Sequence, residues 1–478
     1  MCFEIYCAPF LFLISERVIY MTLYETIAAI STPPGEGGIS VIRISGDKSI
    51  EIADSIFKSP KGKKLTEAKS HTINYGHIIS AENTVIDEVL VSVMKAPHTY
   101  TGENVAEINC HGGIVSTRLV LARCLEAGAV TASPGEFTKR AFLNGRIDLA
   151  KAESVMDIIN SKTNLTHEIA VNQLGGRLSD EINSVREKLL SLLAHIQVLI
   201  DYAEEDLEPL SEEEFSDILS SACISMQHLL DTADRGRLIR SGVMTAIVGK
   251  PNVGKSSMLN LLSGEDRAIV TDIEGTTRDA IEEYINLGDI ALRIIDTAGI
   301  RNTEDIIENI GVDKSKKYMN EADLVLFMLD GKKELDENDR FIMDNLENKN
   351  VIAIINKTED GCAFDPQIVS DRFSDTIMFS VHHSKGIQEL EDKVKNLFDI
   401  GSIQESNTNV ITNIRHKDAL TKALEYTTNA KNALENGIPQ DMVSIDIENS
   451  ISALGEIVGL TVSEEVVDRI FHNFCLGK

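Results

Sequence analysis

The sequence contains no tryptophan, and its cysteines form no C-x-x-C pair. The seven cysteines stand at positions 2, 7, 110, 124, 223, 362 and 475. This spacing excludes the closely paired thiols of zinc ribbons and thioredoxin-like redox motifs. An odd, scattered set of thiols instead fits a reducing compartment. We therefore expect a cytoplasmic protein.

Positive charge is scarce. The chain has 46 Lys and Arg residues against 75 Asp and Glu residues, so its formal net charge is −29. A chain this acidic is expected to be soluble and not to hold nucleic acid through a broad basic face. Any RNA contact must then use local patches or a partner protein. One basic loop, with Lys58, Lys61, Lys63 and Lys64, is expected to be only solvated.

Long apolar runs are also missing. The run from Cys7 to Ile14 has no basic residue before it and is too short to span a bilayer. Met21 begins a more ordinary start. We therefore expect residues 1–21 to be an unstructured extension or a misplaced start, rather than a signal peptide, and we expect no membrane association.

With 478 residues, the chain is long enough for two to four domains. Residues 22–144 alternate short β-type runs, turns and two helical patterns, which indicates an α+β domain. Residues 145–241 and 400–478 are helical in pattern, and residues 242–399 alternate strands and helices. The simplest architecture is one discontinuous helical domain with an α/β domain inserted between its halves.

The first helical segment carries an apolar seam at alternating steps of four and three residues. It comprises Leu178, Ile182, Val185, Leu189, Leu192, Ile196 and Leu199. We expect one long helix here.

The inserted segment begins with a phosphate-binding motif. Residues 249–256 read G-K-P-N-V-G-K-S, after an apolar run and before a helical pattern. This context is typical of a P-loop, whose backbone N–H groups and helix N-terminus hold phosphates. Lys255 would reach the β- and γ-phosphates, and Ser256 would hold Mg²⁺.

Downstream motifs indicate guanine as the base. The Asp-Thr-Ala-Gly at residues 296–299 suits a γ-phosphate sensor near the metal, and Thr276 and Thr277 stand where a switch loop would close over it. Asn-Lys-Thr-Glu at residues 356–359 and Ser-Val-His at residues 380–382 resemble the guanine-reading loops of GTPases. In this order they predict a Ras-like, P-loop GTPase domain.

The predicted nucleotide site is large. It comprises Asn252, Val253, Gly254, Lys255, Ser256, Ser257, Thr271, Asp272, Ile273, Glu274, Gly275, Thr276, Thr277, Asp296, Thr297, Ala298, Gly299, Asn356, Lys357, Glu359, Ser380, Val381 and His382. Within this set, Ser256 and Thr277 are the predicted Mg²⁺ ligands.

Several further motifs resemble the MnmE family of tRNA-modifying GTPases, also called TrmE, over everything after about residue 22. They are T-P-P-G-x-G-G-I, R-I-S-G, Y-T-G-E-N, H-G-G, P-G-E-F-T-K-R-A-F-L-N-G-R-I-D-L and a terminal Cys-x-Gly-Lys. The resemblance implies a GTP hydrolase that modifies C5 of the wobble uridine of certain tRNAs with an aminomethyl or carboxymethylaminomethyl group. It implies a folate one-carbon donor, formyl- or methylene-tetrahydrofolate. It also implies a homodimer and an FAD-containing partner, MnmG or GidA, in a heterotetramer or larger complex.

The resemblance further implies a folate-binding fold for the first domain. Its folate positions match Arg43, Glu107, Arg146 and Lys478, where Arg146 replaces a frequent lysine. An arginine suits a glutamyl carboxylate or the pterin, and a carboxylate suits pterin N–H groups. Cys475 matches the terminal cysteine, a candidate catalytic thiol whose role the sequence leaves open.

Ile300 stands where a glutamine would orient the attacking water in Ras, and the residue that matches the family's acid is Glu308. Glu308 is either that catalytic acid or one more charge in an acidic segment. Potassium positions of the family match Asn252, Thr271, Ile273 and Thr276. Carbonyl and side-chain oxygens there would favour a large monovalent cation, unless Asn252 only forms a turn after the preceding proline.

Glu359 replaces the aspartate of the guanine motif, so its carboxylate is displaced by one methylene, and Asp360 is the rival for that role. Two other functions remain open. One is a ribosome-assembly GTPase without uridine chemistry. The other is a nucleotide-gated scaffold that leaves catalysis to the flavin partner.

Overall fold

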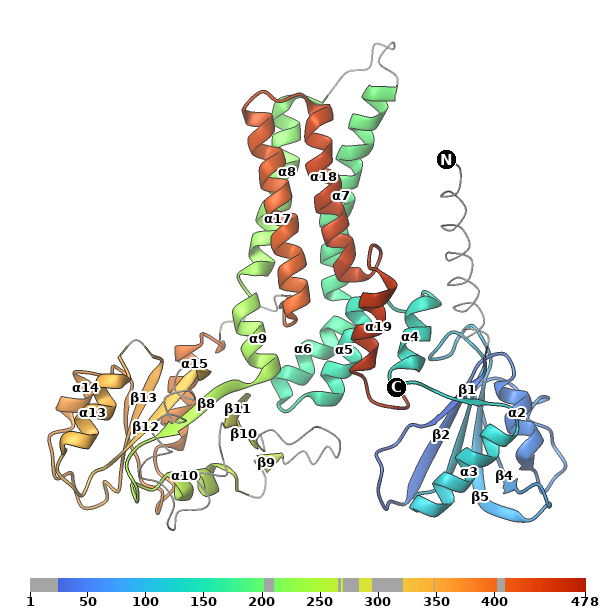
Figure 1. The fold of residues 1–478 in the computed structure, drawn as a ribbon, viewed down its shortest axis with the longest axis horizontal. Helices are drawn as coiled ribbons and strands as arrows, with labels where there is room; N and C mark the ends of the chain where they lie inside the picture. The colour runs from blue at the N-terminus through green and yellow to red at the C-terminus, as the bar shows by residue number, and fades with distance from the viewer. Residues whose placement is uncertain are drawn as a thin grey trace, which may run out of the picture. The chain divides into compact units, whose positions relative to one another are not determined.

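The structure is a computed structural model that describes residues 25–201, 210–264, 268–269, 283–294, 321–347, 349–401 and 409–478 (Figure 1). The predicted extension, residues 1–21, lies outside them. By their own contacts, the described residues form two compact units. The first joins the residues up to Met156 with Val458–Lys478, and the second is Asp157–Ile457. No helix within the described ranges is long and apolar enough to cross a membrane.

The first unit is built on a seven-stranded sheet with the order β3-β4-β5-β6-β2-β1-β7. Its strands are β1 (Ile27–Ile30), β2 (Ile39–Ser45), β3 (Phe57–Lys58), β4 (Thr72–Ile79), β5 (Val85–Met94), β6 (Val105–His111) and β7 (Val130–Thr131). All neighbours pair antiparallel except β1 and β7. The predicted α+β character of this part is confirmed.

Two helices, α2 (Ser49–Ile56) and α3 (Ile114–Glu126), cover one face of this sheet (Figure 1). Alternate residues of the strands, such as Ile42 and Ile108, point into the core between the sheet and these helices. Successive side chains of a strand point to opposite faces. Arg43 and Glu107, one position away, therefore lie on the opposite face.

Among the described residues, helices cover this opposite face at its β1 end. Helix α4 (Glu136–Leu143) places Phe137 against Ile27 and Ala29 of β1. Helix α19 (Glu464–His472), near the C-terminus, packs on α4 and α5 through Phe471. The C-terminal residues therefore lie near β1, the first strand of the described chain.

The second unit contains a mostly parallel sheet with the order β14-β13-β12-β8-β11-β10-β9. Its strands are β8 (Val243–Val248), β9 (Ala268–Ile269), β10 (Glu283–Leu287), β11 (Ile290–Ile294), β12 (Leu324–Asp330), β13 (Val351–Asn356) and β14 (Thr376–Met378). Its helices are α10 (Lys255–Leu262), α13 (Glu337–Asn345), α14 (Gln367–Ser370) and α15 (Ile387–Leu397). The central strands β12 and β13 are buried throughout, because apolar clusters pack on both of their faces.

The remaining helices include α5 (Leu149–Asn160), α6 (Asn164–Leu174), α7 (Arg177–Asp201), α8 (Glu212–Leu230), α9 (Ala233–Ser241), α17 (Ile414–Glu435) and α18 (Gln440–Val458). Helix α8 packs along both α7 and α17, so helices from the two flanks of the inserted sheet lie together (Figure 1). The predicted long helix is α7, whose seam is buried from Leu178 to Ile196.

The predicted domain boundaries remain a proposal, and the grouping of the described residues differs from them at two places. We expected residues 145–241 and 400–478 to form the helical domain, whereas residues 145–156 and Val458–Lys478 group with the first unit. The reason is local packing: Val467, Phe471 and Phe474 share an apolar cluster with Leu149 and neighbouring residues of the first unit.

Candidate functional site

The P-loop follows strand β8 and leads into helix α10. Gly249 and Gly254 have φ angles of 150° and 107°. A Cβ atom at Gly249 would lie 2.4 Å from the carbonyl oxygen of Met328, so only glycine fits against β12. Helix α10 begins at Lys255, and Ser256 and Ser257 occupy its first turn. The loop therefore has the strand–turn–helix geometry that phosphate binding requires.

Lys255 is folded back over this loop. Its Nζ donates to the backbone oxygens of Gly249 and of Lys250, the latter at 2.9 Å. Burial lowers the pKa of Lys255. Phosphate oxygens at the loop would stabilise the charged form of this ammonium group and offer it stronger acceptors than neutral carbonyls.

Asn356 connects the P-loop to the predicted guanine loops. This asparagine ends β13, and its side chain is buried. Its Nδ2 donates to the Val253 carbonyl oxygen at 2.9 Å, and its Oδ1 accepts from the Val381 N–H at 3.3 Å. One side chain thus joins three predicted segments that lie far apart in the sequence.

Lys357 adds a second link to the P-loop. Its backbone has a φ angle of 64°. Its Nζ donates to the Asn252 carbonyl oxygen at 2.9 Å and pairs with Asp330 Oδ2 at 2.7 Å. Asn252 itself has a φ angle of 65°, in the left-handed region that asparagine tolerates well.

The structure separates the two acids of the guanine motif. The Ser380 hydroxyl donates to Glu359 Oε1, and this hydrogen bond lowers the pKa of Glu359. Asp360 pairs with Lys332 Nζ at 2.8 Å, and the same ammonium group lies 4.0 Å from Glu359 Oε2. Glu359 therefore lies against the Ser380–His382 loop, whereas Asp360 is held by a lysine on the loop after β12.

The rest of the predicted nucleotide site, namely residues 271–277 and 296–299 together with Glu308, lies outside the described residues. Of the predicted metal ligands, Ser256 and Asn252 are described. Ser256, the second residue of α10, offers the kind of hydroxyl oxygen that Mg²⁺ accepts at a P-loop. Asn252 stands in the turn before it, with oxygen donors that suit a monovalent cation.

The predicted folate residues gather in the first unit. Arg43 on β2 stands directly opposite Glu107 on β6, and Arg43 Nε lies 2.8 Å from Glu107 Oε1. The Arg43 guanidinium also lies over the rings of Tyr100 and Phe137, 5.1 and 5.5 Å from their centroids. The pair is neither fully buried nor fully exposed, with side-chain exposures of 14% and 25%.

Arg146 reaches the same aromatic ring. Its Nη1 donates to the Tyr100 carbonyl oxygen at 2.9 Å, and its guanidinium lies 5.2 Å from the centroid of the Tyr100 ring. Two predicted cations therefore share Tyr100, a residue that our sequence reasoning did not single out. Its place in the Y-T-G-E-N motif was the signal available.

The C-terminal tail docks beside this group. The Gly477 carbonyl oxygen accepts from Ser31 Oγ at 3.0 Å and from Arg43 Nη1 at 3.5 Å. The Phe137 N–H donates to the Lys478 carbonyl oxygen at 3.2 Å. Gly477 has a φ angle of 87°, and a Cβ atom there would lie 2.1 Å from the Ile30 carbonyl oxygen.

This docking sets the environment of the terminal side chains. Burial, and to a smaller extent the positive charge of Arg43, lower the pKa of Lys478. Cys475 is exposed and reduced. All four predicted folate residues, together with the candidate thiol, thus belong to one unit although they span residues 43–478.

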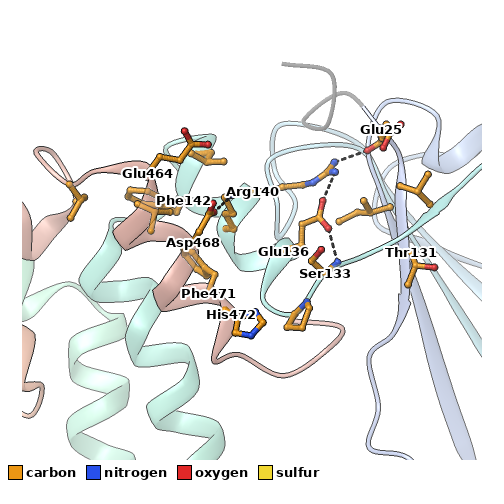
Figure 2. Close-up of a pocket in the computed structure, with 18 residues that line it drawn as sticks. Glu25, Thr131, Ser133, Glu136, Arg140, Phe142, Glu464, Asp468, Phe471 and His472 are labelled. Carbon is orange, nitrogen blue, oxygen red and sulfur yellow. Dashed lines mark hydrogen bonds and ion pairs between the residues drawn. The ribbon is translucent and has the colours of Figure 1, made fainter. Parts of the chain in front are cut away.

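A separate cleft of about 860 Å³ lies between β7, α4 and α19 (Figure 2). Arg140 is buried there, and its Nη atoms pair with Glu136 Oε1 at 2.8 Å and with Glu103 Oε1 at 3.2 Å. Lys139 pairs with Asp468 across the cleft. None of the predicted site residues lines it.

Comparisons with known proteins were made for the whole chain. The family model of the GTP-binding protein TrmE N-terminus matches residues 26–146, and that of the MnmE helical domain matches residues 149–475. Two relatives are each named tRNA modification GTPase MnmE. The protein from Alkaliphilus oremlandii is 50% identical over 461 residues, which cover 96% of this chain and 100% of the relative. The protein from Clostridioides difficile is 48% identical over 460 residues, with the same coverage.

Among solved structures, the G domain of the T. maritima FeoB iron transporter covers 32% of this chain and 98% of its own, at 21% identity and a TM-score of 0.26. A score this low carries no argument. The family is identified by the two family models and by the near full-length relatives. This chain belongs to the MnmE family of tRNA modification GTPases, also called TrmE.

Proposed function

We propose that this GTPase is activated by potassium and, together with an FAD-dependent partner of the MnmG type, modifies C5 of the wobble uridine of certain tRNAs. The product carries an aminomethyl or carboxymethylaminomethyl group, and a reduced folate donates the one-carbon unit. The observation that carries this proposal is the position of Arg43, which pairs with Glu107, shares the Tyr100 ring with Arg146 and contacts the docked chain end that carries Lys478.

The chemistry of this group fits a folate. Glu107 supplies a carboxylate that can accept N–H bonds from a pterin, and the hydrogen bond from Arg43 Nε orients that carboxylate. Arg146 and Lys478 supply positive charge for a glutamyl carboxylate. Tyr100 and Phe137 provide aromatic faces beside these charges. A pterin ring, which is flat and rich in hydrogen-bonding groups, matches such a mixture of aromatic and charged side chains.

The exposed thiol of Cys475 belongs to the same chain end as Lys478. In this proposal it lies beside the folate and takes part in the modification, as donor or acceptor of a proton or as a nucleophile. Its exposure keeps it accessible to a substrate or to the flavin partner.

GTP hydrolysis is assigned to the second unit. Lys255 would contact the β- and γ-phosphates, Ser256 and Thr277 would hold Mg²⁺, and Glu308 would orient the attacking water. Asn252, Thr271, Ile273 and Thr276 would hold K⁺. When bound, the monovalent cation supplies positive charge that stabilises the transition state.

The homodimer is supported by the sheet face that carries Arg43. Beyond the part covered by α4, this face exposes apolar side chains at Ile73, Tyr75 and Leu90, with exposures of 68%, 50% and 45%. Their strand positions place them on the same face as Glu107. A second copy of the chain would cover this apolar surface and close the folate site from above.

Reconstitution tests the proposal. Purified protein is combined with the flavin partner, reduced folate, GTP and unmodified tRNA, and the wobble uridine is analysed by mass spectrometry. We expect modification with the wild-type chain and none with Cys475→Ser, while GTP hydrolysis by that variant stays intact. Modification that is complete without the folate, or unchanged in both Cys475→Ser and Arg43→Ala, would favour a scaffold that leaves the chemistry to its partner.

A further inference from the structure

Positive charge is concentrated in one loop of this acidic chain. Residues 58–69 contain five lysines and one glutamate, and no separate stretch of twelve residues holds more than three Lys or Arg residues. These lysines are Lys58, Lys61, Lys63, Lys64 and Lys69. We call this segment the basic loop. Its local charge contrasts with a net charge of −29 for the whole chain.

All five lysines of the basic loop are exposed. Carboxylates do not neutralise them: none of the ion pairs found among the described residues includes one of the five. The nearest acid in sequence, apart from Glu67, is Asp54, and its carboxylate accepts from the Leu65 N–H and the Thr66 hydroxyl instead. The ammonium groups are therefore available to a polyanion.

The basic loop is held to the core of the first unit. Leu65, in its middle, is 1% exposed and belongs to the apolar cluster under the sheet. The Ala68 N–H donates to the Leu65 carbonyl oxygen at 3.0 Å, and Lys95 Nζ donates to the Thr66 carbonyl oxygen at 3.4 Å. A loop with a buried anchor presents its charges in a defined place, so binding through it costs less ordering entropy than binding through a free tail.

The first residue of the basic loop, Lys58, lies on the sheet face that carries the candidate folate site, whereas Leu65 is buried on the other face. Lys58 pairs with His77 in the sheet, and His77 pairs with Glu88. Following these pairs across β5 and β6 puts Lys58 on the face that carries Glu107 and Arg43. Strand spacing and residue rise separate Lys58 from Glu107 by on the order of 20 Å along this face.

We propose that the basic loop binds the phosphate backbone of the tRNA and thereby holds it on the first unit, at the β3 edge of the sheet. The inference rests on the proposed function and adds to it the surface that receives the nucleic acid. Lysine contacts to phosphates carry no sequence information, so the loop provides affinity and register, not the choice among tRNAs. In an acidic chain, such a local patch supplies the attraction that the overall charge opposes.

The test uses the full chain with Lys58, Lys61, Lys63 and Lys64 replaced by alanine. A control variant removes four other exposed lysines, Lys48, Lys188, Lys333 and Lys422, for the same change in net charge. Affinity for unmodified tRNA is measured over a series of salt concentrations. Each lost phosphate contact should flatten the slope of log affinity against log salt by about one. We expect a loss of about tenfold or more in affinity at low salt for the loop variant and a much smaller loss for the control.

Equal affinities and salt slopes for the loop variant and the control would overturn the proposal. The wild-type chain could modify tRNA in the reconstituted system while the loop variant has an unchanged KM for tRNA. That result would refute tRNA binding by the basic loop and leave the proposed function standing. If the wild-type chain neither binds nor modifies tRNA, both fail. Circular dichroism and thermal unfolding check folding, and a double variant, Lys61→Glu with Lys64→Glu, replaces the quadruple variant if that variant does not fold.

Discussion

Arg43 Nε lies 2.8 Å from Glu107 Oε1, although 64 residues separate the two in sequence. They face each other across the antiparallel pair β2–β6. The guanidinium also contacts the docked chain end through the Gly477 carbonyl oxygen. One ion pair therefore joins the centre of the sheet to the last residues of the chain, and the first three predictions concern this junction.

Removing the guanidinium should weaken the candidate folate site. We expect Arg43→Ala to lower affinity for a reduced folate by about 1.5–3 kcal/mol, the contribution of a hydrogen bond to a charged group. Isothermal calorimetry measures this directly. Arg43→Lys is the matched control, because it keeps the charge and loses the planar guanidinium. Its folate affinity should lie between those of the wild type and Arg43→Ala. An affinity that Arg43→Ala leaves unchanged would exclude Arg43 as a ligand.

Lys478 should make folate binding depend on pH. Its pKa is lowered in the folded chain by burial and by Arg43, so it loses its proton at a lower pH than an unfolded lysine does. Stability consequently rises with pH between the folded and unfolded pKa values, since the unfolded chain binds more protons there. A ligand carboxylate prefers the charged form, so affinity should fall as pH rises through the folded pKa.

Calorimetry across this alkaline range tests the prediction. Lys478→Arg keeps its charge throughout and should flatten the pH dependence. If the wild-type chain and Lys478→Arg show the same profile, the ionisation of the ligand itself explains the effect, and Lys478 does not bind its carboxylate.

The tail should detach when its glycine is substituted. At Gly477, alanine would combine a φ angle of 87° with a Cβ atom 2.1 Å from the Ile30 carbonyl oxygen. We expect Gly477→Ala to abolish tRNA modification and to weaken folate binding at least fivefold, with GTP hydrolysis unchanged. Gly437→Ala is the control, because Gly437 has a φ angle of 73° with open space around it. It should cost only about 1–2 kcal/mol of stability. Normal folate binding in Gly477→Ala would contradict a role for the docked tail.

Glu359 should limit the affinity for guanine nucleotides. Its extra methylene misplaces the carboxylate relative to an aspartate, and its hydrogen bond with Ser380 holds it against the last guanine loop. We expect Glu359→Asp to bind GTP more tightly. Asp360→Ala, which removes the closer of the two carboxylates at Lys332, should bind GTP as the wild type does. Fluorescent-nucleotide titration provides the comparison. Weak binding by Asp360→Ala alone would reassign the role to Asp360.

Potassium should accelerate GTP hydrolysis. The chain has no glutamine after Asp-Thr-Ala-Gly. A cation held by Asn252 would place positive charge beside the phosphates, where catalytic arginines elsewhere contribute roughly 10³–10⁵ in rate. We expect much faster turnover in KCl than in NaCl at equal ionic strength. Asn252→Ala should erase this difference and leave GTP affinity largely intact. Equal rates in the two salts, with saturating Mg²⁺ and GTP, would refute the potassium site.

The local elements of this protein could be predicted from sequence because short-range physics determines them. The seam from Leu178 to Leu199 recurs with the period of a helix, and the structure has α7 at Arg177–Asp201. The strands Thr72–Ile79 and Val85–Met94 lie among the short β-type runs predicted for residues 22–144. The P-loop motif likewise specifies its own turn, because its glycines and its helix start are neighbours in the chain.

The arrangement of the candidate sites was decided only by tertiary structure. No local pattern shows that Gly477 packs against Ile30, or that Val458–Lys478 groups with the first unit. Local sequence patterns also do not show that Arg43 and Arg146 share the Tyr100 ring, or that Glu359 rather than Asp360 contacts Ser380. These contacts join segments distant in sequence. They form because the packing of the whole unit buries apolar faces and pairs backbone N–H and C=O groups that each segment alone would leave exposed or unpaired.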